Sequence, residues 1–162
     1  MVSIGVIGSG AWGTALSILL SNEGIATTLW EHRPERAISM QQQRENTLFL
    51  PGFRFPTTLQ ITPDIGEAVQ GKDTLLLVTP SQRMRENLRL LAPYLSQDAL
   101  LVNASKGIEI KSLRRMTEVI AEELPAARSR IAALSGPSIA QEVAEGLPTA
   151  AVVAASEQEV AV

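Results

Sequence analysis

The sequence predicts an α/β fold, a doubly wound and mostly parallel β-sheet with helices on both of its faces. Short apolar runs alternate with amphipathic stretches of helical spacing along all 162 residues. Most of these runs are continuously apolar, which is typical of strands that are covered on both sides. The length and the 45% apolar content fit one domain with a core of its own.

Six apolar runs are the predicted strands. They occupy residues 3–7, 27–30, 74–78, 100–102, 131–134 and 149–154. Helix-like segments separate them, so we expect consecutive strands to be joined by right-handed crossovers and to run parallel. In such a sheet a ligand binds beyond the carboxyl ends of the strands.

The predicted helices carry apolar residues at intervals of three and four. They occupy residues 11–22, 34–46, 83–95 and 112–124. In the last of these, Leu113 and Met116 lie on the same apolar stripe. Ser138 and Ser156 each begin a capping-box spacing, which predicts two further helices.

Charge and composition exclude several classes of function. The net charge is −3 without a basic block, so neither nucleic acid nor an anionic membrane is an expected partner. The chain has no cysteine, and His32 is its only histidine, so we expect no metal site and no thiol chemistry. No apolar run is long enough to span a bilayer, and the chain opens on a strand without a targeting leader. These features predict a soluble, cytoplasmic protein.

Small and polar residues follow the first five predicted strands. The strand ends lead into Gly8-Ser9-Gly10, Glu31-His32-Arg33, Thr79-Pro80-Ser81, Ser105-Lys106-Gly107 and Ser135-Gly136-Pro137-Ser138. Because the carboxyl ends of parallel strands meet at one edge of a sheet, these five segments are expected along the same edge. The sequence therefore predicts one composite site there.

A glycine loop, Gly-Ser-Gly-Ala-Trp-Gly, connects the first predicted strand to the first predicted helix, as in a Rossmann-type fold. Gly8 makes the tight turn, Gly10 lets a pyrophosphate approach the backbone, and Gly13 lets the helix pack on its strand. The helix N-terminus then attracts the phosphates. We expect Ala11 in the same cradle and Trp12 in the wall of the cofactor site, although Trp12 also suits a core position.

The end of the second strand carries signals for both nicotinamide dinucleotides. Glu31 lies eighteen residues after Gly13, near the spacing of the acid that accepts a hydrogen bond from the adenosine 2′-OH of NAD. Arg33 instead suits the 2′-phosphate of NADP. His32 either stacks near the adenine or is an ordinary exposed side chain. The expected cofactor is therefore NAD or NADP, and the sequence does not choose between them.

Two further loops present groups that suit anions. Lys106 is placed to meet a phosphate or a substrate oxyanion, but an exposed lysine in a loop is also common. The segment 135–138 and the helix predicted after it provide a second helix N-terminus, which is either an anion site or simply a capped helix.

Five segments in order resemble the bacterial NAD(P)-dependent glycerol-3-phosphate dehydrogenases. They are Gly-Ser-Gly-Ala-Trp-Gly at 8–13, Leu-Trp-Glu-His-Arg at 29–33, Phe-Leu-Pro-Gly at 49–52, Ser-Lys-Gly-Ile-Glu at 105–109 and Ser-Gly-Pro-Ser at 135–138. The last two are far more specific than the glycine loop, and the set covers essentially the whole chain. Two positions depart from the family, because Ala11 replaces a frequent serine and Glu31 stands where small residues are common.

The resemblance implies a set of site residues and a reaction. Trp12, His32, Arg33, Phe49, Lys106 and Ala140 would contact the cofactor, and Lys106, Gly136 and Ser138 would contact the substrate. The family interconverts dihydroxyacetone phosphate and sn-glycerol 3-phosphate by hydride transfer, for phospholipid synthesis. Its catalytic lysine belongs to a C-terminal helical domain. We therefore assign no catalytic residue within 1–162, which is the expected dinucleotide-binding domain of a homodimeric enzyme.

Two alternative functions stay open from the sequence. One is another reductase of the 6-phosphogluconate dehydrogenase-like group, which sequence beyond residue 162 would distinguish. The other is a non-catalytic module that senses NAD(H). A sensor accounts for the glycine loop but not for the segments 105–109 and 135–138.

Overall fold

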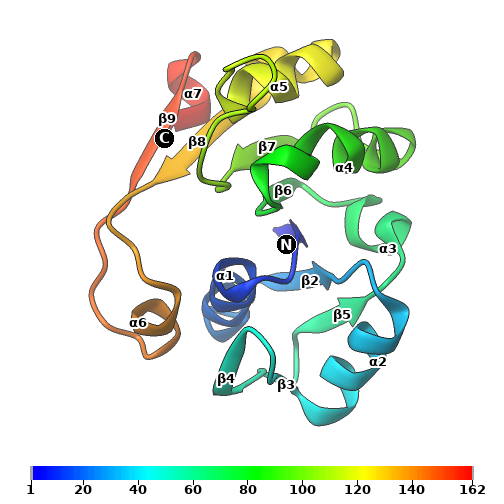
Figure 1. Cartoon of the computed structure of the whole chain (residues 1–162), viewed down its shortest axis with the longest axis vertical. Coiled ribbons are helices and arrows are strands. Elements are labelled where there is room, and N and C mark those ends of the chain that lie inside the picture. The colour runs from blue at the N-terminus through cyan, green and yellow to red at the C-terminus, as the bar shows by residue number, and fades with distance from the viewer. Residues whose placement is uncertain (1, 162) are drawn as a thin grey trace.

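The computed structural model describes residues 2–161, which contain one seven-stranded sheet in the order β5-β2-β1-β6-β7-β8-β9 (Figure 1). Its strands are β1 (Ser3–Ile7), β2 (Ala26–Trp30), β5 (Gln60–Thr62), β6 (Thr74–Leu77), β7 (Leu100–Asn103), β8 (Ile131–Ser135) and β9 (Val152–Ala155). All neighbours pair in parallel except β8 and β9. The predicted α/β, mostly parallel fold is confirmed.

Seven helices connect or follow these strands within the described residues. They are α1 (Ala11–Asn22), α2 (Pro34–Gln43), α3 (Ile65–Val69), α4 (Met84–Leu91), α5 (Met116–Glu123), α6 (Ala140–Ala144) and α7 (Gln158–Ala161). Short 3-10 turns precede and follow α4, and another precedes β8. No helix in this part of the chain combines the length and the apolarity that crossing a membrane requires.

The sheet separates two apolar cores, which explains the continuously apolar strands. Along β6, Leu76 packs with α1, α2 and α6 on one face, whereas Leu75 and Leu77 pack with α3, α4 and α5 on the other. Successive side chains of a strand point to opposite faces, so both faces need apolar residues when both are covered. The doubly wound arrangement therefore follows directly from the composition of the strands.

The strand order reverses at β1, because β2 pairs with one of its edges and β6 with the other. The chain thus leaves β1 and β6 toward helices on opposite faces of the sheet and opens a crevice at their carboxyl ends. This crevice is where the fold positions a ligand.

The predicted strand 149–154 differs from expectation in direction. Beyond β8 the chain forms only the short α6, which packs against α1 (Figure 1). It then re-enters the sheet at the carboxyl end of β8. It therefore enters β9 antiparallel to β8, with Ser135 opposite Val152. The expectation that consecutive strands run parallel fails only for this pair, since a parallel strand needs a crossover that returns the chain to the amino ends of the strands.

Two predicted helices are shorter than their apolar patterns suggested. The helix expected over 34–46 ends at Gln43, because Arg44 adopts a left-handed conformation with φ of 54° and its guanidinium donates to the carbonyls of Pro56 and Leu59. The helix expected over 112–124 begins only at Met116. Leu113 has φ of 58° and is 73% exposed, so its place on a buried stripe was wrong.

The segment between α2 and β6 contains elements that the sequence did not predict. A small hairpin joins β3 (Glu45–Asn46) to β4 (Leu50–Arg54), and β5 and α3 follow it. β3 has only two residues, and β4 contains Pro51 and Gly52, two residue types that sequence reasoning assigns to turns, so neither shows an alternating pattern. The hairpin is relevant to the site because Phe49 lies in the loop between its two strands.

Candidate functional site

The glycine loop forms the turn between β1 and α1, as predicted. Gly8 has φ of 121°, and a Cβ there would lie 2.5 Å from the carbonyl oxygen of Val78. A Cβ on Gly13 would lie 1.9 Å from the carbonyl oxygen of Gly8, so this position needs glycine for close packing of α1. A Cβ on Gly10 would meet nothing within 4 Å, which leaves open space above the N-terminus of α1.

A pocket of about 910 Å³ lies over this turn, at the crevice between β1 and β6. It contains all the residues predicted to contact a cofactor: Gly8, Gly10, Ala11, Trp12, Gly13, Glu31, His32, Arg33, Phe49, Lys106 and Ala140. Ser138, a predicted substrate residue, lies in the same wall, whereas Gly136 does not line the pocket. Five segments distant in sequence therefore meet at one edge of the sheet.

Arg33 and His32 are exposed at the end of β2. The guanidinium of Arg33 forms no ion pair with any acidic side chain within residues 2–161. It is therefore a cation whose charge is available to an anionic ligand in the pocket.

Glu31 is placed differently from its two neighbours, because its side chain is fully buried. Its Oε2 accepts a hydrogen bond from the hydroxyl of Ser9 and lies 3.1 Å from Nη2 of Arg36. Its Oε1 accepts from the backbone N–H of Arg33 at 2.9 Å and lies 3.1 Å from Nδ1 of His32. Both oxygens are thus engaged inside the protein.

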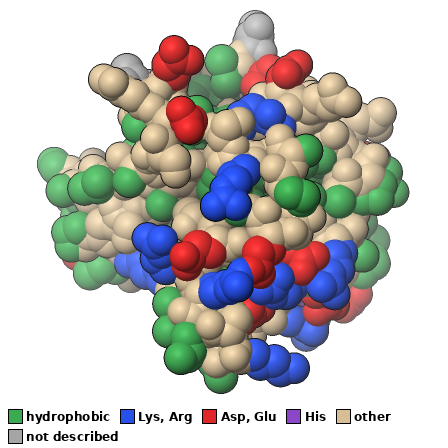
Figure 2. All heavy atoms as spheres, turned by 90° about the horizontal axis from the view of Figure 1, so that it is seen from above, with side chains coloured by type: hydrophobic (Ala, Val, Ile, Leu, Met, Phe, Trp, Pro, Cys, Tyr) green, Lys and Arg blue, Asp and Glu red, His purple; other side chains and the backbone are tan. Residues whose placement is uncertain are grey.

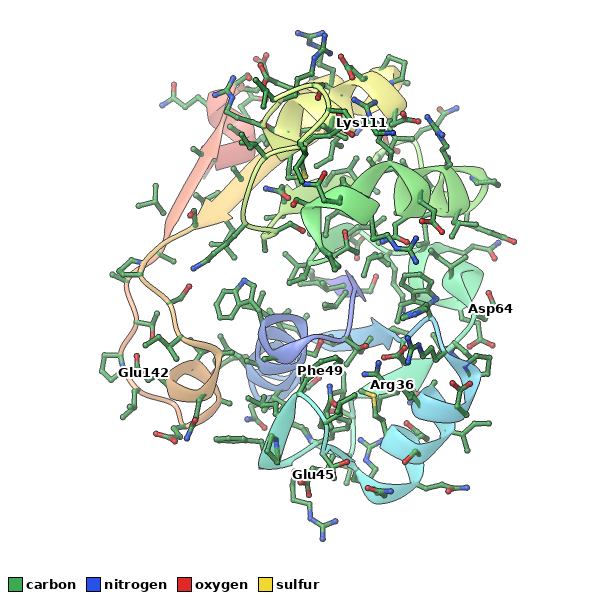
Figure 3. All side chains as sticks on the ribbon, viewed as in Figure 1. Arg36, Glu45, Phe49, Asp64, Lys111 and Glu142 are labelled. Carbon is green, nitrogen blue, oxygen red and sulfur yellow. The ribbon has the colours of Figure 1, made fainter. Side chains whose placement is uncertain are left out.

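Arg36 is a pocket residue that the sequence reasoning missed. Its guanidinium lies 4.7 Å from the ring centroid of Phe49, a cation–π distance, while it also faces Glu31. Figure 3 shows Arg36 on α2 near Phe49, which comes from the loop of the β3–β4 hairpin. The sequence offered one signal for Arg36, which lies three residues after Arg33 and therefore near it at the start of a helix. Its contact with Phe49, 13 residues further along the chain, could not be read from that spacing.

Lys106 lies on the loop after β7, and its Nζ donates to the carbonyl oxygen of Gly136 at 3.4 Å. The structure therefore brings together two of the residues predicted to bind substrate. The hydroxyl of Ser105 donates to the carbonyl of Leu77 at 3.0 Å, which fixes the start of this loop on β6. Lys106 itself is exposed and free to turn toward a ligand.

The far side of this loop is clamped to the start of α4. Nε2 of Gln82 donates to the carbonyl of Ile108 at 2.8 Å, and the N–H of Ile110 donates to Oε1 of Gln82 at 3.1 Å. Arg85 adds a bidentate pair to Glu109, with distances of 2.7 and 2.9 Å. The loop that carries Lys106 is thus held at both of its ends.

Arg85 also belongs to a larger network of charges on α4 and α5. It contacts Glu122 and Glu123, and Glu123 in turn accepts from Arg89. Figure 2 shows basic and acidic side chains alternating across this face. The hydrogen bonds from Arg85 lower the pKa of Glu109 from the usual 4.5 to about 2, with a further contribution from Ser112. The same contacts raise the pKa of Arg85.

The segment after β8 differs from its predicted geometry. The helix expected after Ser138 is α6, a single turn of five residues capped by Ile139 without a side-chain hydrogen bond. The capping-box interpretation of Ser138 was therefore wrong, and so short a helix provides no substantial anion site. Ser138 remains in the pocket wall through the course of the loop.

The sheet order, the glycine loop at its switch point and the cations around the pocket define an α/β domain of the dinucleotide-binding class. The family model described as NAD-dependent glycerol-3-phosphate dehydrogenase N-terminus matches residues 3–161. The chain therefore belongs to the glycerol-3-phosphate dehydrogenase family.

Particular relatives agree with this assignment. The chain is 50% identical over 159 residues to a glycerol-3-phosphate dehydrogenase [NAD(P)+] of Geobacter metallireducens, covering 98% of this chain and 48% of that protein. The crystal structure of glycerol-3-phosphate dehydrogenase from Coxiella burnetii has a TM-score of 0.88 at 32% identity, over 97% of this chain and 47% of that one. The chain thus spans about half the length of the relatives it matches.

Proposed function

We propose that this chain is the dinucleotide-binding half of an NAD(P)-dependent glycerol-3-phosphate dehydrogenase, which interconverts dihydroxyacetone phosphate and sn-glycerol 3-phosphate. The observation that carries the proposal is the single pocket in which the glycine loop, Arg33, Lys106 and Ser138 meet. A sensing module would need the glycine loop and the β2 end, but it has no use for a lysine held beside Gly136.

The residues present fit a dinucleotide. The open space over Gly10 admits a pyrophosphate to the free N–H groups of the first turn of α1. Trp12, His32, Arg33 and Phe49 surround the part of the pocket beyond that turn, and Arg33 supplies a positive charge there. When bound, the nicotinamide supplies the hydride-transfer chemistry of the family.

The expected substrate region comprises Lys106 and Ser138, which line the pocket, and Gly136, whose carbonyl accepts a hydrogen bond from Lys106. Lys106 contributes a positive charge and Ser138 a hydroxyl, which together suit a phosphate or a carbonyl oxygen. Binding the phosphate, remote from the reacting carbon, orients the substrate for hydride transfer. Ala140 closes the same wall on the cofactor side.

We assign the proton donor to a part of the enzyme beyond these 162 residues. The chain has three lysines. Lys72 precedes β6, at the opposite edge of the sheet, and donates to Thr28. Lys111 lies outside the pocket, and Lys106 is assigned to binding. Without the donor and the covering domain, the ketone is neither protonated nor shielded from water.

Calorimetry with NADH and NADPH tests the binding half of the proposal. The 162-residue chain is expected to bind a dinucleotide and to show no reduction of dihydroxyacetone phosphate, whereas the full-length protein reduces it. Robust turnover by the 162-residue chain would place the proton donor within it. Binding without turnover by the full-length protein would instead favour the sensing module.

A further inference from the structure

The carboxylate of Glu31 is surrounded by groups of the protein. It accepts from the Ser9 hydroxyl and the Arg33 N–H, and it faces Arg36 and His32, with no exposed side-chain surface. A ribose hydroxyl needs a lone pair on an oxygen it can reach at hydrogen-bond distance. Although Glu31 belongs to the pocket wall, its side chain has no exposed surface and both of its oxygens already have partners within the protein, so it offers no such lone pair.

We propose that Glu31 is a positioning residue, which ties the glycine loop to the end of β2 and does not itself bind the ribose. This inference rests on the proposed dinucleotide-binding function. Ser9 lies within the glycine loop, and the N–H of Arg33 lies at the exit of β2. One buried carboxylate thus joins the phosphate-binding turn to the backbone that carries Arg33.

The buried side chain of Asn46 also holds Ser9, through the backbone carbonyl of Ser9. Nδ2 of Asn46 donates to the carbonyl of Ser9 at 2.8 Å and to the hydroxyl of Thr14 at 2.9 Å. Its Oδ1 accepts from the N–H of Phe49 at 3.3 Å. Ser9 is therefore fixed at its hydroxyl by Glu31 and at its carbonyl by Asn46, and the Phe49 loop is tied to both.

The pairing of Glu31 with Arg36 also affects the net charge that a ligand meets at the end of β2. Arg36 offsets the buried negative charge while its guanidinium packs on Phe49. Arg33 is left as an additional cation at the surface of the pocket. Glu31 consequently does not repel a 2′-phosphate, and the geometry admits both NAD and NADP.

The test compares Glu31→Ala with the unaltered chain for three ligands that differ only at the adenosine 2′ position: NADH, NADPH and 2′-deoxy-NADH. Dissociation constants are measured by calorimetry. In Glu31→Ala the glycine loop loses its tie to β2 and must be ordered upon binding, so we expect the affinity for each ligand to fall about tenfold or more. The factor should be the same for the three ligands within about threefold. If Glu31 bound the ribose hydroxyl, NADH alone would weaken, 2′-deoxy-NADH would be unchanged and NADPH would gain. That pattern would overturn the inference.

Two further variants keep the test valid should Glu31→Ala fold poorly. Ser9→Ala removes only the hydroxyl that meets Glu31, and it should weaken all three ligands by a common factor. Glu31→Gln keeps an acceptor for the Arg33 N–H and a donor for Ser9, so it should restore most of the 2′-deoxy-NADH affinity. Failure of both expectations would contradict the positioning role.

Glu35→Ala is the matched control, because it removes the same charge from an exposed position on the first turn of α2. It should leave all three affinities near those of the unaltered chain. If the unaltered chain binds none of the ligands, the proposed function fails. If it binds them and Glu31→Ala shows the ribose-dependent pattern, only the positioning role fails.

Discussion

Arg33 and Glu31 are two residues apart, yet their side chains face different surroundings. Arg33 is exposed in the pocket wall without an acidic partner in the described chain, whereas Glu31 is buried among four groups. Strand alternation does not distinguish them, because residues i and i+2 leave a strand on the same side. Both residues lie beyond the end of β2 at Trp30, where contacts from Ser9 and Arg36 bury Glu31 and leave Arg33 exposed as the N-cap of α2.

We therefore expect Arg33→Ala to weaken NADPH more than NADH. A charge-assisted hydrogen bond to a phosphate contributes about 1.5–3 kcal/mol, which corresponds to about a tenfold to hundredfold change in the dissociation constant. Calorimetric titration of both ligands measures the difference, with Arg128→Ala as a control far from the pocket. Equal losses for NADPH and NADH would remove Arg33 from the 2′ position.

Lys106 gives a second prediction for a single side chain. In the full-length enzyme, Lys106→Ala should raise the KM for dihydroxyacetone phosphate at least about tenfold, since a charged partner of the substrate is lost. The melting temperature should change little, because the only hydrogen bond of the Lys106 side chain within residues 2–161 is at 3.4 Å and exposed. Lys111→Ala is the matched control. A large fall in melting temperature with normal kinetics would make Lys106 a structural residue.

At the scale of elements, α4 and the 3-10 turn that precedes it matter because they hold the loop after β7. Gln82 and Arg85 fix that loop through Ile108, Ile110 and Glu109. The sequence indicated the loop and the helix separately, but the contacts between them depend on the packing of α4 beside α5.

This clamp should show a defined dependence on pH. The pKa of Glu109 is lowered from 4.5 to about 2 in the folded chain, so its pairing with Arg85 stabilises the fold fully above pH 4.5. That contribution is lost as the pH falls through about 2. Melting temperatures of the unaltered chain and of Arg85→Ala should therefore differ at pH 5–7 and converge toward pH 2. A difference that stays constant down to pH 2 would contradict the assigned pairing.

At the scale of the whole molecule, one sheet shares its strands between two cores. Leu29 belongs to the core beneath α1, and Leu101 belongs to the core beneath α4 and α5. Both side chains are fully buried. Because β1, β2, β6, β7 and β8 each contribute side chains to both cores, the loss of packing on either face should weaken the same folding unit.

Leu29→Ala and Leu101→Ala should each cost about 2–5 kcal/mol of unfolding free energy. Leu113→Ala, at a position 73% exposed, should cost less than about 0.5 kcal/mol. Urea unfolding followed by circular dichroism and by tryptophan fluorescence measures these values. The two probes should give one coincident transition in every variant. Separate transitions for the two signals would show that the cores unfold independently.

The sequence by itself determined the α/β class, the glycine loop and the edge at which the site lies. These features depend on local patterns: continuously apolar strands, a glycine spacing and polar residues at strand ends. All the predicted cofactor residues line one pocket for this reason.

The tertiary structure alone decided how the side chains at that edge are used. The direction of β9 follows from the return of the chain past α1, and the left-handed turn at Arg44 depends on carbonyls 12 and 15 residues away. The burial of Glu31 requires Ser9 and Arg36 to converge on it from two elements. Such contacts join residues distant in sequence, so no local spacing encodes them, and only the folded chain brings them within hydrogen-bond distance.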